Sequence, residues 1–263
     1  MKKGTIFITP LDHRNRRNAL FREIISICPE GDYSRLMYIT PTVSALEEGR
    51  KQFFKFQQAR SKNSYIPFRT MTIQHLCHSL EELYGGKETI SNALKPIILS
   101  EILDDRDLGY SRLLSELMGN IRHYLPGTGL HRIKQIVGEL IFEEKTLLRA
   151  VRAIEDLETY EQELVKRSLL DEDGLLLTCI PIAKEHLELE ILVLDGFFDP
   201  TPLEKEILSC LMDKAEEVYA IALEKSEFAE FLIDGNPKTS SPNLSRGHGR
   251  PFTIQRLARN TEH

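Results

Sequence analysis

Short apolar runs alternate with amphipathic stretches over the first 85 residues. The run 4–9 (GTIFIT) is rich in β-branched residues and ends at a proline, which is typical of a strand, and the apolar spacing that follows is that of a helix. The pattern predicts three strand–helix units, which are 4–9 with 19–28, 35–39 with 43–58, and 68–71 with 73–84. Strands that alternate with helices favour a parallel sheet covered by helices, so we expect an α/β fold.

The middle of the chain has a different pattern. From about residue 91 to 189, Leu and Ile recur at three- and four-residue spacing between charges, which predicts helices only. The strand pattern returns at 189–194 (LEILVL), and a proline-opened helix at 202–214 and a strand at 217–223 follow. We therefore predict an α/β domain made of residues 1–85 and 189–234, an all-helical insertion at 86–188, and a flexible tail or the truncated start of another domain at 235–263.

Composition and charge narrow the class of protein. A chain of 263 residues with 41% hydrophobic residues has enough apolar material for a sizeable core. Its formal net charge of -6 argues against a protein that coats nucleic acid by bulk charge, so any contact with DNA must come from a local patch. No apolar run approaches the length of a membrane span or a signal peptide, and the four scattered cysteines suggest reduced core thiols. We expect a cytoplasmic protein without membrane contact.

The loop after the first strand stands where a P-loop NTPase binds phosphate. A working loop needs glycines for close backbone approach, a Lys for the β- and γ-phosphates, and a Ser or Thr hydroxyl for Mg²⁺. Aligned on the strand end, these positions hold Pro10, Asn15, Arg16 and Arg17. Pro10 removes a donor, Asn15 adds a side chain, and Arg17 offers no oxygen to a metal. The loop is either a degenerate nucleotide site or an ordinary connection between strand and helix.

Asp195 ends the apolar run LEILVL, where such a fold places the carboxylate that organises magnesium. Hydrolysis also needs a neighbouring polar group to orient water, and the next residue is Gly196. An Asp-Gly pair after a strand is also a common turn, so both interpretations stay open.

The segment 191–211 (ILVLDGFFDPTPLEKEILSCL) resembles the corresponding segment of AddB-type subunits of bacterial helicase–nuclease complexes, which are similar to superfamily 1 helicases of the UvrD kind. Three further stretches follow the order that this family has, and they are 6–17, 36–54 (LMYITPTVSALEEGRKQFF) and 68–83. The resemblance covers residues 4–225 and implies a helicase-like α/β domain (1A) with a helical insertion (1B). It also implies a role in recombination and in the repair of double-strand breaks by an exodeoxyribonuclease complex.

The departures from active members fall at the degenerate Walker A positions and at Gly196, so the resemblance implies no ATP hydrolysis by this chain. No strand carries the Asp/Glu-x-Lys pattern of a nuclease, and His75, Cys77 and His78 diverge too far along one helix to hold a metal. We therefore expect no catalytic residue, metal or cofactor.

In the helicase layout the segments after the second and third strands face single-stranded DNA. The candidate contacts are hydroxyls and cations that would hold the backbone without reading sequence, and they are Thr40, Thr42, Arg60, Lys62, Arg69, Thr70, Thr72 and His75. Thr42 and Thr72 fit equally well as caps of the helices that follow them.

The leading hypothesis is a non-catalytic, helicase-like module that acts as a scaffold and as a weak, salt-dependent contact for single- or double-stranded DNA beside a catalytic partner subunit of the AddA type. One alternative is a divergent ATPase in which Arg16 replaces the P-loop Lys and Asp195 holds Mg²⁺. The other is a freestanding protein-interaction module, because the helical insertion offers a large surface to partner helices.

Overall fold

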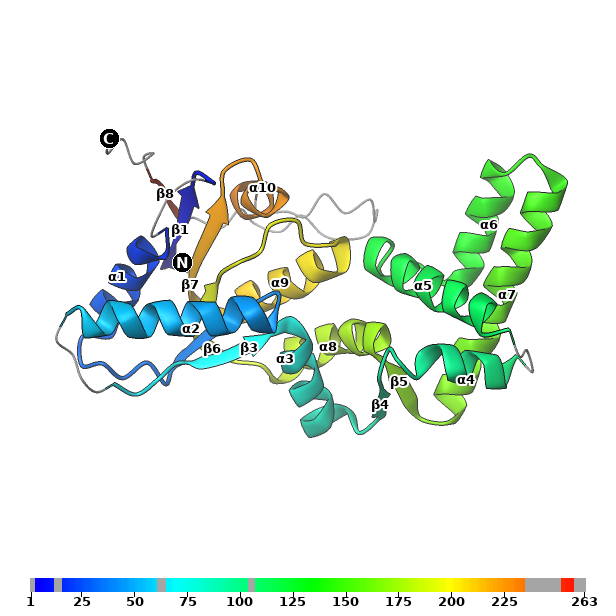
Figure 1. Cartoon of the computed structure of the whole chain (residues 1–263), viewed down its shortest axis with the longest axis horizontal. Helices are drawn as coiled ribbons and strands as arrows, with labels where there is room; N and C mark the ends of the chain where they lie inside the picture. Colours follow the sequence, from blue (N-terminus) through cyan, green and yellow to red (C-terminus); the bar gives the residue numbers. More distant parts are fainter. Residues whose placement is uncertain (1–2, 12–15, 61–64, 104–106, 235–251, 258–263) are drawn as a thin grey trace. The chain divides into compact units, whose positions relative to one another are not determined.

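The protein forms two compact units in the computed structural model (Figure 1), which describes residues 3–11, 16–60, 65–103, 107–234 and 252–257. The first unit is Met1–Leu76 with Ala183–His263, and the second is Cys77–Ile182. The boundaries fall inside two helices, whereas the sequence pattern predicted them near residues 85 and 189. A helix continues across a boundary without a break in its periodicity, so its pattern does not mark where one unit ends.

The first unit is built on a parallel sheet, as the alternation of strands and helices predicted. Its strands run in the order β3-β2-β6-β7-β1-β8, and each neighbouring pair is parallel. The strands are β1 (Lys3–Thr9), β2 (Leu36–Thr40), β3 (Arg69–Thr72), β6 (Leu189–Leu194), β7 (Ala215–Leu223) and β8 (Thr253–Arg256). All their carboxyl ends therefore lie at one edge of the sheet, which we call the carboxyl edge.

Helices cover both faces of this sheet. They are α1 (Arg17–Ile27), α2 (Val43–Gln58), α9 (Pro202–Lys214) and α10 (Glu227–Asp234), and the unit also includes the first residues of α3 (Ile73–Leu80). Residues at alternate positions of β2 and β6, such as Tyr38 and Val193, join side chains of α1 and α2 in one apolar cluster. The helices α9 and α10 pack against β7 without joining that cluster, so they cover the other face.

Four residues of the predicted tail form the last strand of the sheet. Residues 253–256 form β8, which pairs in parallel with β1, with Thr5 opposite Thr253 and Ile8 opposite Arg256. Its four side chains are exposed, so the segment lacks the buried apolar face from which a strand is recognised in sequence. Residues 235–251 and 258–263 of the predicted tail lie outside the described residues.

The second unit is a helical lobe. Its helices are the end of α3, the π-helical turn η1 (Glu81–Gly85), α4 (Lys95–Ile102), α5 (Leu108–Tyr124), α6 (Leu130–Leu140), α7 (Glu144–Lys166) and most of α8 (Glu172–His186). The prediction of helices only is wrong at one place, because β4 (Glu88–Ile90) pairs in parallel with β5 (Leu169–Asp171). Each strand has three residues, too few to show a period in the sequence.

The elements agree closely with their predicted bounds: α2, β6 and α9 begin and end where the pattern placed them. All four cysteines are buried, as expected of core thiols. Among the described residues, no helix combines the length and the apolar character needed to cross a membrane.

Candidate functional site at the carboxyl edge of the sheet

Asp195 lies at the carboxyl edge, directly after β6, and it is only 1% exposed. Its backbone N–H donates to the carbonyl oxygen of Ile39 at 3.1 Å, which continues the pairing of β6 with β2 by one residue. Side chains alternate along a strand, so Asp195 falls on the same face as Ile191 and Val193, beneath α1 and α2. The fold therefore buries a carboxyl group under two helices.

Two side chains bind the same oxygen of this carboxylate. Arg17, the first residue of α1, places its Nε 2.5 Å from Asp195 Oδ2, and the Tyr38 hydroxyl donates to that oxygen as well. Arg17 Nη1 also donates to Gln52 Oε1 at 3.1 Å, and Gln52 in turn donates to Glu48 Oε1 at 2.6 Å. The network thus joins α1, α2, β2 and the end of β6.

The protonation states follow from burial and charge. Burial lowers the pKa of Arg17, but the charge of Asp195, the hydrogen bond to it and further electrostatic contributions from Tyr38 and Glu48 together outweigh burial. The pKa of Arg17 is therefore raised and the guanidinium stays cationic. Burial also raises the pKa of Tyr38 well above its usual value, and the negative charge of Asp195 raises it further. A neutral Tyr38 and a cationic Arg17 are both donors, which is the pairing that a buried carboxylate requires.

Two glycines make room for this arrangement. A Cβ on Gly49 of α2 would lie 2.6 Å from the Tyr38 hydroxyl oxygen, so only glycine lets the helix pass over that side chain. Gly196 has φ of 85°, the left-handed region, and a Cβ there would lie 3.4 Å from atoms of Pro41 and Ala45. The chain turns at Gly196 directly after Asp195, so turn chemistry accounts for this glycine.

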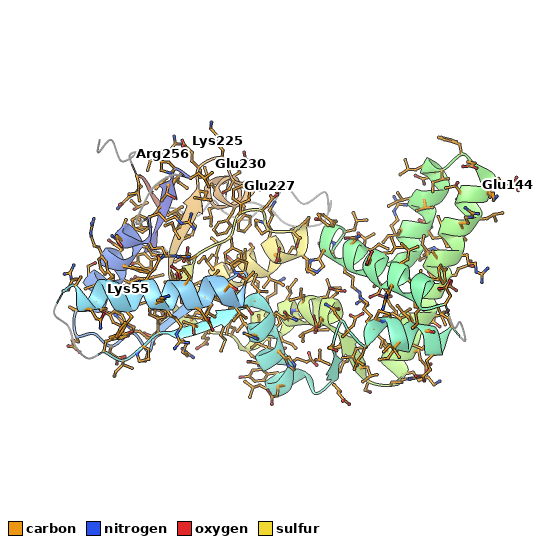
Figure 2. The ribbon with its side chains drawn as sticks, viewed as in Figure 1. Lys55, Glu144, Lys225, Glu227, Glu230 and Arg256 are labelled. Atoms are coloured by element: carbon orange, nitrogen blue, oxygen red, sulfur yellow. The ribbon has the colours of Figure 1, made fainter. Side chains whose placement is uncertain are left out.

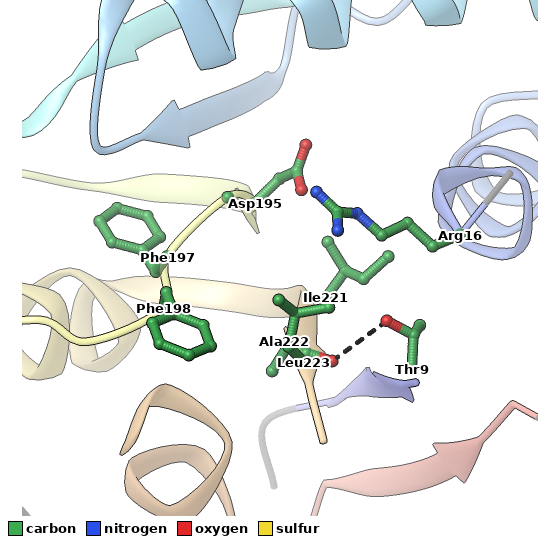
Figure 3. A pocket seen from close by; sticks show the side chains of 9 residues that line it. Thr9, Arg16, Asp195, Phe197, Phe198, Ile221, Ala222 and Leu223 are labelled. Carbon is green, nitrogen blue, oxygen red and sulfur yellow. Dashed lines mark hydrogen bonds between the residues drawn. The ribbon is translucent and has the colours of Figure 1, made fainter. Parts of the chain in front are cut away.

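A small pocket adjoins the carboxylate (Figure 3). Its volume is about 40 Å³, room for a few water molecules, and its lining includes Thr9, Arg16, Asp195 and Phe198. Figure 3 shows the Arg16 side chain extending from the start of α1 toward Asp195, with the Phe198 ring on the other side of the pocket. The pocket thus has a cation and an aromatic ring in its wall, next to a carboxylate that Arg17 and Tyr38 already bind.

The four residues that align with P-loop positions have different surroundings. Pro10 is buried directly after β1, Arg16 borders the pocket, and Asn15 lies outside the described residues. Arg17, at the position of the Mg²⁺-binding hydroxyl, instead places a positive charge on the carboxylate at the end of β6. A guanidinium bonded to Asp195 competes with any cation for that oxygen.

The candidate DNA contacts fall into two groups. Thr40 and Thr72 are paired in register at the carboxyl edge, and Thr42 and His75 begin the helices that follow. Arg69 begins β3 at the opposite edge. Arg60 follows the end of α2, about 25 Å along the helix from Thr42.

Most of the hydroxyls in this set are engaged locally. Thr42 accepts from Ala45 N at 3.2 Å and Thr72 from His75 N at 3.2 Å, so both cap helices. Thr40 is 0% exposed and Thr72 is 5% exposed, so burial removes these two predicted contacts from the surface.

The other members of the set differ in exposure. Thr42, His75, Arg60 and Arg69 are exposed, and Thr70 is half-buried within β3. The Arg60 guanidinium lies 6.0 Å from the centre of the Phe56 ring, within the range of a cation–π contact. Lys62 lies outside the described residues.

Sequence reasoning missed Tyr38, Gln52 and Gly49. Tyr38 stands in an apolar strand where an aromatic residue is expected, and only the pairing of Tyr38 with Val193 brings it next to Asp195.

In the part of the chain that the structure describes, no three His, Cys, Asp or Glu side chains are grouped so as to hold a metal ion. Comparison with protein-family models and with curated proteins finds no match to this chain.

Proposed function

We propose that this chain is a catalytically inactive, helicase-like module that works as a scaffold and weak DNA contact in the cytoplasm, within an AddB-type helicase–nuclease assembly for double-strand-break repair. Its catalytic partner would be the AddA-type subunit. Two observations support this: the resemblance of residues 4–225, and the parallel sheet, at whose carboxyl edge lie both Asp195 and Pro10.

The Arg17–Asp195 ion pair carries the proposal of inactivity. An NTPase uses the carboxylate after this strand to organise Mg²⁺, and it uses a hydroxyl at the start of the helix to bind that ion. Here the helix supplies a guanidinium that neutralises the carboxylate, and Tyr38 occupies the same oxygen. Releasing Asp195 for a metal would leave the charge of Arg17 without its buried partner, which opposes the exchange.

The test of inactivity is ATP hydrolysis with and without single-stranded DNA. We expect turnover at the background rate for the wild type and for Asp195→Asn, because no ATPase centre exists to be lost. Turnover of about 1 s⁻¹ or faster that Asp195→Asn abolishes would instead establish the divergent ATPase.

Weak DNA binding is supported by the exposed groups that remain at the carboxyl edge. The N-terminus of α2 lies there with Thr42 exposed, and a helix N-terminus favours an anion. Glu47 and Glu48 follow on the same helix, and the whole chain carries a net charge of -6, so the attraction to phosphate is small. We therefore expect binding at low salt that falls steeply as salt is added.

The DNA test uses a variant that changes the charge at the carboxyl edge and keeps the helix cap. Thr42→Asp keeps an N-cap oxygen and adds a negative charge that suits the helix dipole, so the fold is retained while phosphate is repelled. Arg60→Gln with Arg69→Gln tests the opposite edge. With labelled oligo-dT at low salt, we expect Thr42→Asp to weaken binding several-fold and the double variant to have a smaller effect; unchanged affinity in Thr42→Asp would exclude the carboxyl edge as the DNA path.

A further inference from the structure

The pair α6–α7 in the helical unit ends in a turn that exposes large apolar side chains. Leu140 is 69% exposed and Phe142 is 95% exposed, and Leu148, one turn into α7, is 63% exposed. Figure 1 shows α6 and α7 as neighbouring helices joined by a short turn, and Figure 2 labels Glu144 at that end of the pair. We call residues 139–144 the hairpin tip.

The exposure of the tip does not arise from a loose connection. Ile141 N donates to Val137 O at 3.0 Å and Leu147 N donates to Glu143 O at 2.9 Å, so both helix ends are hydrogen-bonded up to the turn. The Thr146 hydroxyl also donates to the Glu143 carboxylate at 2.6 Å. Phe142 is therefore held between two ordered helix ends, which lowers the entropy lost when it binds a partner.

The hairpin does not need these side chains for its own packing. Toward their other ends α6 and α7 contribute Leu130, Ile133, Ile154 and Leu157 to the core of the unit, and all four are buried. An aromatic residue presented on a rigid turn beyond that core is the arrangement of a binding anchor.

The charges around the tip select the chemistry of its partner. Glu139, Glu143 and Glu144 flank the apolar centre, and Lys145 is the nearest cation in the sequence. Glu143 and Glu144 also suit the N-terminus of α7, but Glu139 stands in the last turn of α6, where a negative charge opposes the helix dipole. These carboxylates repel nucleic acid and anionic lipid, so they favour a protein surface with basic side chains.

We infer that the hairpin tip docks into an apolar pocket rimmed by Lys or Arg on the catalytic partner subunit, with Phe142 as the anchor and Leu140 beside it. The choice of partner rests on the proposed function, whereas the tip itself and its chemistry rest on the helical unit alone.

The test measures binding of the purified AddA-type subunit from the same organism to the full chain. We expect Phe142→Asp to weaken binding about 30-fold or more, as for an interface hot spot, with little change in thermal stability because the side chain is exposed. Val165→Asp is the matched control, since Val165 is 72% exposed near the other end of α7, about 30 Å from the tip, and should bind as the wild type does.

Glu139→Lys separates binding from folding. The substitution suits the end of α6 and should stabilise the helix, yet it places a cation against a basic rim, so binding should weaken several-fold at low salt and approach the wild-type value at high salt.

Equal binding by Phe142→Asp and the wild type would overturn the inference and leave the proposed function intact. Equal loss in Phe142→Asp and Val165→Asp would overturn it too, because the effect would not belong to the tip. No binding of the wild-type chain would overturn both the inference and the assigned partner, and weaker oligo-dT binding by Phe142→Ala would assign the tip to DNA instead.

Discussion

Arg17 Nε lies 2.5 Å from Asp195 Oδ2, and their side chains are 7% and 1% exposed, although 178 residues separate them in the chain. The pair fastens the first helix of the α/β unit to the end of β6. A buried pair of this kind is costly to break from one side, because the remaining charge stays buried without its partner.

Replacing Arg17 by Met should therefore lower the free energy of unfolding by about 3–5 kcal/mol. The matched control is Arg35→Ala: Arg35 lies 3.8 Å from Glu190, both side chains are about half exposed, and the cost should stay below about 1 kcal/mol. Urea denaturation measures both. Adding Asp195→Asn to Arg17→Met should recover part of the loss, and simple additivity of the two substitutions would show that the groups do not interact.

Gly49→Ala should destabilise the protein by roughly 1–3 kcal/mol, because the new methyl group would meet the Tyr38 hydroxyl and displace it from Asp195. Gly138→Ala in α6 is the control, since a Cβ there has nothing within 4 Å and the substitution should stabilise the helix by about 0.5–1 kcal/mol. The melting temperature should fall for Gly49→Ala and rise for Gly138→Ala. A shift of both melting temperatures in the same direction would contradict the geometry at Tyr38.

A buried ionic network holds the helical unit together. Replacing its central cation should lower the free energy of unfolding about as much as replacing Arg17. Lys95 is 1% exposed, and its Nζ lies 2.6 Å from Asp173 Oδ2 and 3.3 Å from Asp171 Oδ2. Lys95→Met would leave two carboxylates short of a cation, with an expected loss of about 3–5 kcal/mol. Lys134→Met, which breaks the partly exposed pair with Glu155, should cost less than about 1 kcal/mol in the same chemical denaturation experiment.

The same network predicts how stability depends on pH. Burial raises the pKa of Asp173, but the hydrogen bond with His123 and the charge of Lys95 outweigh it, so the pKa lies well below its usual value. A carboxyl group whose pKa is lower in the folded state stabilises the protein above its unfolded pKa of about 4, and this contribution is lost as the pH falls toward the folded value.

Asp173→Asn should therefore be less stable than the wild type at pH 7, by roughly 1.5–3 kcal/mol, and the difference should shrink on going from pH 5 to pH 2. The exposed Glu144→Gln serves as the control for loss of one carboxyl group. A difference between Asp173→Asn and wild type that stays constant across the acid range would show that Asp173 has the same pKa folded and unfolded.

The sequence by itself determined the elements whose pattern is local. A nearly continuous apolar run placed β6, and helical periodicity placed α2 and α9. The end of the apolar run placed Asp195 at the carboxyl edge of a parallel sheet. These features depend on which positions of a segment are buried, and burial determines which neighbouring residues are apolar.

Tertiary structure alone decided what surrounds Asp195. The order of the strands brought Tyr38 beside it, and the packing of α1 placed Arg17 on the carboxylate. The pairing of these two residues with Asp195 has no local signal in the sequence. The exposed strand β8 and the three-residue strands β4 and β5 were decided in the same way, by hydrogen bonds to distant segments. Because such contacts join residues far apart in the chain, local periodicity cannot predict them. Which charges are paired depends on how the sheet and the helical core pack in the folded chain.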